Sequence, residues 1–116
     1  MSFADLPEHA VYLDDKRGPF VESWEWVETI AALVARLDEG PVPYLSLDYD
    51  LSATDAGHTG LDAILALKER DAWPPVIQIH SGDFINVKKM AALIQETGLY
   101  QAPEEHPLGD IYRKLV

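Results

Sequence analysis

Three short apolar stretches of this 116-residue chain are followed by side chains that bind metal ions or transfer protons. These side chains are Asp14 and Asp15 after AVYL, Asp48 and Asp50 after YLSL, and His80 and Ser81 after VIQI. Carboxylate oxygens are the ligands that Mg²⁺ prefers, and the ordinary pKa of imidazole, about 6.5, suits proton transfer near neutral pH. These residue types together indicate metal-dependent chemistry on an anionic group such as a phosphate.

The clustered aspartates predict a divalent cation because like charges repel at short range. Two carboxylates about 4 Å apart repel by roughly 4 kcal/mol at an effective dielectric constant of about 20. Such a group either takes up protons or is neutralised by a cation, and a bound Mg²⁺ with open positions also attracts phosphate. We therefore predict a site for Mg²⁺ or Mn²⁺ whose ligands are Asp14, Asp15, Asp48 and Asp50.

Each of these residues also has a structural alternative. Asp14 and Asp15 can cap the loop that follows them, and Asp50 can close an Asx turn. His80 can act as a general acid, as a metal ligand or as a group that a carboxylate orients. Ser81 either binds phosphate or caps its loop.

Three side chains near the strand ends are predicted substrate contacts: Arg17, Ser81 and His58. The guanidinium of Arg17 can grip a phosphate through two hydrogen bonds, or it can pair with Asp14 or Asp15. His58 lies in the polar loop GHTG, which we expect above the strand ends.

The pattern of apolar residues and helix-breaking residues predicts alternating strands and helices. We expect strands at 10–14, 23–28, 44–48 and 76–80, with a further short strand near 98–101. Helices are expected at 30–39, after Thr29 as the N-cap, at 61–71 and at 86–98. The tail, about 98–116, is expected to be irregular or to end in a short helix.

Strands that alternate with helices predict a single α/β domain over residues 1–116, with a mostly parallel central sheet of four to five strands covered on both faces. In sheets of this kind, ligands bind at the carboxyl ends of the strands. Neighbouring strands lie about 4.8 Å apart, so polar residues at adjacent strand ends become neighbours. We therefore expect the three polar groups to form one site.

Composition limits the classes of partner. The formal net charge is −11, which disfavours extended DNA or other long polyanions and favours a small phosphorylated substrate. The chain has no cysteine, no apolar run long enough to cross a membrane and no signal peptide at its start, so we expect a cytoplasmic protein. The sequence indicates no oligomeric state.

The ordered motifs VYLDDKR, LSLDYDL, TGLDAIL and VIQIHS resemble the cyclic-phosphate-processing receiver-like domains over about residues 10–97. The resemblance implies a three-layer, flavodoxin-like fold and the handling of cyclic or terminal phosphates on nucleotides or RNA ends. It implies that Asp14 and Asp15 hold Mg²⁺ and that Asp48 takes the place of the phosphate-accepting aspartate of receivers. His80 stands where receivers have Thr or Ser, and we find no counterpart of the receiver lysine.

Two functions remain open. The first is a divalent-metal-binding domain that acts on or binds a small phosphate ester, as a metal-dependent phosphoesterase or cyclic-phosphate-processing hydrolase with Asp48 and His80 as catalytic residues. The alternative is a non-catalytic receiver-like interaction or regulatory module. The missing lysine and the unusual fourth strand end disfavour ordinary phosphorelay in both.

Overall fold

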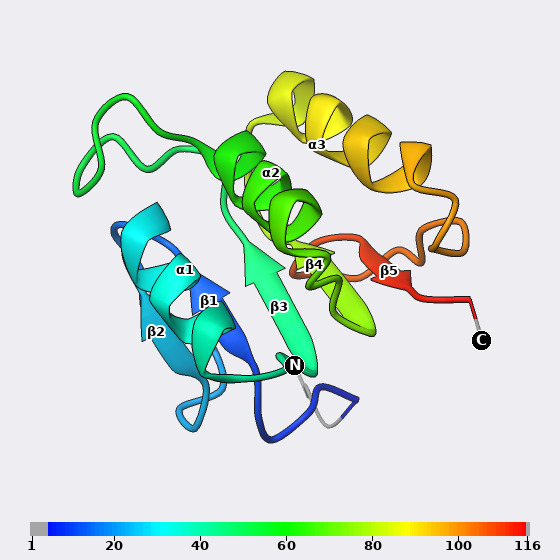
Figure 1. The fold of residues 1–116 in the computed structure, drawn as a ribbon, viewed down its shortest axis with the longest axis horizontal. Helices are drawn as coiled ribbons and strands as arrows, with labels where there is room; N and C mark the ends of the chain where they lie inside the picture. The colour runs from blue at the N-terminus through cyan, green and yellow to red at the C-terminus, as the bar shows by residue number, and fades with distance from the viewer. Residues whose placement is uncertain (1–4, 116) are drawn as a thin grey trace.

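The computed structural model describes residues 5–115. In chain order its elements are β1 (Val11–Leu13), β2 (Glu25–Val27), α1 (Ile30–Glu39), β3 (Tyr44–Leu47), α2 (Gly60–Arg70), β4 (Val76–Ile79), α3 (Phe84–Glu96) and β5 (Ile111–Arg113). The five strands form one sheet in the order β2-β1-β3-β4-β5 (Figure 1). All neighbours are parallel except β4 and β5, which are antiparallel. This arrangement confirms the predicted α/β fold with a mostly parallel sheet, as in receiver-like, flavodoxin-like proteins.

The three helices begin at side chains that cap their free N–H groups, which is why the chain turns helical at these positions. The hydroxyl of Thr29 accepts a hydrogen bond from the backbone of Ala32, so the predicted N-cap of α1 is confirmed. Thr59 and Asp62 form a reciprocal capping box at the start of α2, and Asp83 caps α3. No helix in the described residues is long and apolar enough to cross a membrane.

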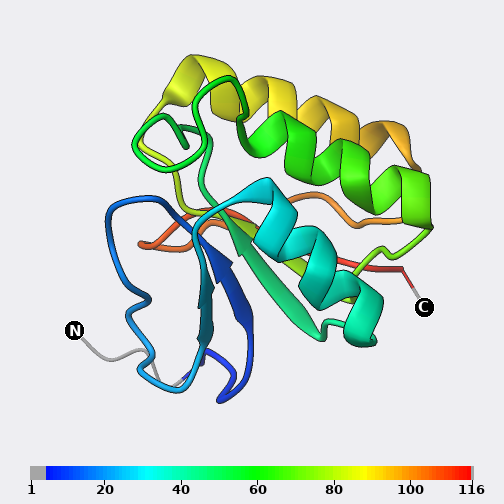
Figure 2. The ribbon, with the colours of Figure 1, turned by 60° about the vertical axis from the view of Figure 1, so that its left-hand side comes forward.

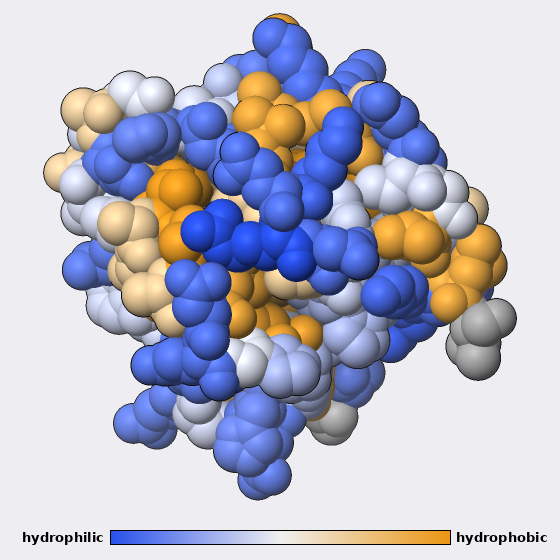
Figure 3. Space-filling view, in the orientation of Figure 1, coloured by the Kyte–Doolittle hydropathy of each residue, from blue (hydrophilic) through white to orange (hydrophobic). Residues whose placement is uncertain are grey.

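All three helices pack on one face of the sheet (Figure 2). A single core cluster joins residues of α1, α2 and α3, such as Leu33, Ile64 and Met90, to strand residues including Leu47. Alternate strand residues point to the opposite face because side chains of a strand alternate between its two sides. On the face of the molecule that carries the helices, hydrophilic residues separate several hydrophobic patches (Figure 3).

The opposite face of the sheet is covered by irregular chain segments. Tyr12, Trp24 and Tyr44 form a second, smaller cluster there, and Val21 packs against it from the loop between β1 and β2. The loop before β5 lies on the same side, where the carbonyl of Gly109 accepts a hydrogen bond from a strand side chain. The sheet is thus covered on both faces as expected, but in the described residues the third layer contains no helix.

The C-terminal part differs from the prediction. Within 98–101, Tyr100 makes only an isolated bridge to Lys114, and the last strand is β5, Ile111–Arg113. The tail therefore contains a strand and no terminal helix in the described residues. Two prolines in the tail suggested irregular structure, whereas Gly109, with a φ of 129°, makes the turn that leads the chain back along β4.

Candidate functional site

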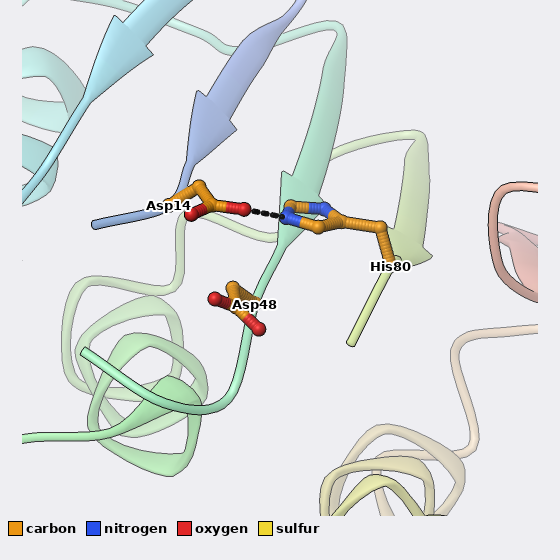
Figure 4. A group of neighbouring side chains, drawn as sticks. All are labelled: Asp14, Asp48 and His80. Atoms are coloured by element: carbon orange, nitrogen blue, oxygen red, sulfur yellow. Dashed lines mark hydrogen bonds and ion pairs between the residues drawn. The ribbon is translucent and has the colours of Figure 1, made fainter. Parts of the chain in front are cut away.

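Three neighbouring strands end at the same level, which brings three predicted site residues together. Leu13 pairs with Leu47, and Leu47 pairs with Ile79, so β1, β3 and β4 are in register at their carboxyl ends. The residues that follow form one row across the sheet: Asp14, Asp48 and His80. One ligand atom from each lies within 4.8 Å of the other two (Figure 4).

The ring of His80 is held on three sides. Its Nδ1 lies 2.7 Å from the hydroxyl of Ser46, and its Nε2 lies 3.1 Å from Oδ2 of Asp14. The ring also stacks on Tyr12, with 4.3 Å between centroids and 8° between planes. Ser46 lies on the strand between them, and its small side chain leaves room for the imidazole to reach Tyr12. The His80 side chain is only 7% exposed.

These contacts favour one tautomer of the neutral ring. An ionised carboxylate can only accept hydrogen bonds, so Nε2 carries the proton toward Asp14 and Nδ1 accepts from the hydroxyl of Ser46. The partners are the same residue types as a hydrolase Ser-His-Asp triad. Ser46 is 1% exposed, however, so its hydroxyl cannot attack a substrate. The chain of contacts therefore orients His80 and Asp14.

Asp14 is buried and accepts four hydrogen bonds. The backbone N–H groups of Lys16 and Arg17 donate to Oδ1, while Tyr12 and His80 contact Oδ2. Burial alone would raise the pKa of Asp14, but the bonds from His80 and from the two N–H groups lower it to about 2. Asp14 is therefore ionised at any pH near neutrality.

The surroundings of Asp48 raise its pKa, whereas those of Asp14 lower it. Within the described residues, its Oδ1 accepts a hydrogen bond from the backbone of Tyr49. Burial raises the pKa of Asp48 above its ordinary value, and the negative charge of Asp14 raises it further. The proximity of His80 and hydrogen bonds from Tyr49 and Ser81 oppose this rise. Asp48 is thus the less satisfied carboxylate of the pair, with oxygen lone pairs left for a ligand.

The row of residues opens into a cavity of about 460 Å³. Five aspartates line it: Asp14, Asp15, Asp48, Asp50 and Asp83. The cationic side chains in its wall are those of Lys16 and Arg17. With this excess of negative charge, an anionic ligand needs an accompanying cation to enter.

The other predicted site residues lie at different distances from the row. Asp15, Asp50, Arg17 and Ser81 line the same cavity. Asp15 accepts a hydrogen bond from Ala53, and Asp50 accepts one from Ser52, which is the Asx turn that was its structural alternative.

His58 is not among the cavity-lining residues. Its Nδ1 lies 2.9 Å from Asp55, and its side chain is 51% exposed. The structure therefore gives no support for a substrate contact at His58.

The sequence did not reveal the residues of the sheet that contact His80 and Asp14 and fix their side chains. Tyr12 and Ser46 precede Asp14 and Asp48 by two positions, so they share a face of the sheet with them. A polar residue in the middle of an apolar strand, as in YLSL, was the available signal. Gly109 was also missed: a Cβ there would lie 1.9 Å from the carbonyl oxygen of Ile79, so the tail packs directly on the strand end before His80.

Replacing Ser46 with alanine should show that its hydroxyl fixes the imidazole. We expect the free energy of unfolding to fall by about 1–3 kcal/mol, because Nδ1 of a buried ring loses its partner. Chemical denaturation measures the loss, and the ¹⁵N shift of Nδ1 of His80 should move because it loses the hydrogen bond from Ser46, while Asp14 keeps the proton on Nε2. Ser52→Ala, in the exposed loop, is the control. An unchanged Nδ1 shift and an unchanged free energy of unfolding in Ser46→Ala would show that the hydroxyl does not hold the ring.

One of the comparisons with known proteins finds a match. A family model described as the cyclic-phosphate processing receiver domain matches residues 9–96. The matched segment contains β1 to β4 and the whole of the row at their ends. No curated protein and no solved structure matches the chain.

Proposed function

The chain belongs to the cyclic-phosphate processing receiver domain family, and from this premise we propose that it binds a divalent cation and opens a small cyclic phosphate ester at the row of Asp14, Asp48 and His80. The observation that carries the proposal is the convergence of these three side chains within 4.8 Å inside a cavity with excess negative charge. Asp15, Asp50, Arg17 and Ser81, which line the cavity, are the remaining contacts that we assign to it.

The donor set fits Mg²⁺ or Mn²⁺. Asp48 and Asp14 offer carboxylate oxygens, and both ions take one or two carboxylates together with waters and phosphate oxygens. Asp14 already accepts four hydrogen bonds, so Asp48 is the carboxylate best able to contact the ion directly. When bound, such a cation supplies positive charge that polarises the phosphate and makes water more acidic.

The charge of the cavity favours a cyclic ester over a terminal one. A cyclic phosphate diester carries one negative charge, whereas a terminal monoester carries about −1.5 to −2 at pH 7. Five aspartates surround the site and two cationic side chains, Lys16 and Arg17, oppose them. The more highly charged monoester meets more repulsion, so a terminal phosphate suits the site as a product that leaves.

The reaction adds one water molecule to the ring. The water oxygen forms a new bond to phosphorus, one ester P–O bond breaks, and a proton from the water ends on the released alkoxide oxygen. In this proposal Arg17 and Ser81, which line the cavity, hold phosphate oxygens, and the His80 ring fixes the Asp14 carboxylate through its hydrogen bond to Oδ2. His80 is thus a positioning residue in this proposal, because both ring nitrogens already have partners.

Turnover of 2′,3′-cyclic AMP with Mg²⁺, Mn²⁺ or EDTA, followed by ³¹P NMR, tests the proposal. We expect turnover that requires the metal and that falls at least about a hundredfold in Asp48→Asn, since electrostatic groups at such sites contribute about 2.7–4 kcal/mol to the barrier. Asp38→Asn removes the same charge from α1 and serves as the control. Turnover in EDTA, or full activity of Asp48→Asn, would contradict the proposal.

A second candidate is a non-catalytic interaction module. Phe84 and Ile85, at the start of α3 beside the cavity wall, are 81% and 75% exposed, as in a contact surface for a partner. This function predicts Mg²⁺ binding without turnover. It also predicts that acetyl phosphate leaves Asp48 unmodified, because β5 is antiparallel and brings no lysine to the place that receivers use.

A further inference from the structure

The cavity is larger than the volume that a hydrated divalent cation would fill. The six waters of a hydrated divalent cation occupy about 180 Å³ at about 30 Å³ each, well under half of the cavity volume of about 460 Å³. Volumes in this range are typical of pockets for small organic ligands. Room therefore remains for an organic group attached to the phosphate.

Part of the wall around this extra volume is apolar. Phe20, Pro107 and Leu108 line the cavity together with the aspartates. Phe20 is 58% exposed, although an aromatic side chain of this size is normally buried. An exposed aromatic ring in the wall of a polar cavity is a surface on which a planar ligand can stack.

Phe20 is carried by a segment that is tied to the acidic row. The backbone N–H groups of Lys16 and Arg17 bind the carboxylate of Asp14, which fixes the start of this loop. The indole of Trp26 donates a hydrogen bond to the Asp14 carbonyl and packs against Gly18. The loop next packs onto the sheet at Val21. Phe20 is thus held between two anchored points.

The second apolar segment is anchored independently. Leu108 donates its backbone N–H to His106, and the carbonyl of Gly109 accepts a hydrogen bond from Gln78 of β4. Both segments lie on the side of the sheet away from the helices, as Figure 2 shows. A ligand at the row of Asp14, Asp48 and His80 therefore meets apolar groups on two fixed segments.

We infer that the ester is a nucleoside phosphate whose base stacks on Phe20 while its phosphate lies at the acidic row. This inference rests on the proposed function and deepens it, because it assigns the base to a named residue and distinguishes nucleosides from sugar phosphates. The negative cavity also favours one nucleotide over the end of a long RNA, since each further phosphate brings another charge. Phe20 is a specificity-determining residue in this assignment.

The affinity for two esters, with and without a base, tests the inference in the presence of Mg²⁺. The esters are 2′,3′-cyclic AMP and methyl riboside 2,3-cyclic phosphate, and the measure is the dissociation constant, or KM where the ester is turned over. We expect the parent to bind the nucleotide about 5- to 150-fold more tightly, the range of a single base stacked on an aromatic side chain. An oligonucleotide ending in a cyclic phosphate should bind more weakly than the mononucleotide.

Variants of Phe20 distinguish base stacking from changes that affect the binding of both esters. Phe20→Ala should lose most of the preference for the nucleotide without changing affinity for the base-free ester, and Phe20→Trp should keep it. Leu65→Ala, which shortens an exposed apolar side chain of α2 outside the cavity lining, is the control and should behave as the parent. Circular dichroism checks that each variant folds.

The outcomes distinguish the two proposals. If the parent binds both esters equally, or Phe20→Ala keeps the preference, the inference about the base is wrong and the proposed function stands. If neither ester binds with Mg²⁺ or Mn²⁺, the proposed function is wrong and the inference falls with it.

Discussion

Asp14→Ala is expected to lower the free energy of unfolding by about 3 kcal/mol in the absence of metal, since removing one partner from a buried charged network costs about 3–5 kcal/mol. The substitution leaves Tyr12, His80 and two backbone N–H groups without their acceptor. At about 4 °C per kcal/mol for a domain of this size, the unfolding temperature should fall by roughly 12 °C. Calorimetry or thermal denaturation followed by circular dichroism measures the change.

Asp15→Ala is the matched control for this prediction. Asp15 is adjacent and similarly buried, but within residues 5–115 its carboxylate accepts one hydrogen bond, from the backbone of Ala53. We expect a loss of about 1 kcal/mol. Asp14→Asn, which keeps an acceptor for the two N–H groups, should fall between the two alanine variants. Equal losses for Asp14→Ala and Asp15→Ala would show that the four-donor network does not stabilise the fold.

Asp48→Asn is expected to do the opposite and stabilise the metal-free protein. Carboxylate oxygens of Asp14 and Asp48 lie within 4.8 Å of each other, and two unit charges at that limit repel by roughly 3.5 kcal/mol at an effective dielectric constant of about 20. Partial exposure to water and the proximity of His80 reduce this repulsion, so we expect a gain of about 1 kcal/mol and a rise of roughly 4 °C in the unfolding temperature. Asp38→Asn, on the surface of α1, should change the unfolding temperature little. A destabilised Asp48→Asn would contradict the assigned repulsion.

The two carboxylates should also differ in their pH dependence. The pKa of Asp14 is lowered from 3.8 to about 2, so its contribution to stability is present above pH 3.8 and is lost as the pH falls toward 2. The pKa of Asp48 is raised above 3.8, so the parent loses stability as the pH rises from 3.8 through that raised value. The advantage of Asp48→Asn should therefore vanish near pH 3.8 and reach its full size near neutrality.

The position of the site followed from the sequence because it depends on strand ends alone. Each short apolar run stops at a polar residue, and parallel strands place their carboxyl ends at one edge of the sheet. Asp14, Asp48 and His80 therefore had to be neighbours once β1, β3 and β4 were adjacent. The structure brings these three together as that argument predicts.

The different environments of the carboxylates did not follow from the sequence. Asp14 and Asp48 have the same side chain and the same place after a strand. The difference comes from the loop after β1, which folds back over Asp14 and donates two backbone hydrogen bonds to its carboxylate. The roles of Tyr12 and Ser46 depend on how far the His80 ring reaches across β3, and strand spacing alone does not give that distance.

The C-terminal strand was missed for a different reason. A three-residue strand carries too few positions to show periodicity, and its direction is set by the turn at Gly109 rather than by its own sequence. The placement of all three helices on one face likewise depends on how the strands are connected. The strand order, together with the handedness of the connections, puts α1, α2 and α3 on the same face.

The most direct test of the central claim is the unfolding temperature of the parent and of Asp48→Asn as Mg²⁺ is raised from zero to about ten times its dissociation constant at constant ionic strength. Binding at that concentration stabilises the folded state by about 1.4 kcal/mol, so the parent should gain roughly 5 °C, while Asp48→Asn should gain almost nothing. An equal rise in both proteins would show that Asp48 does not hold the cation.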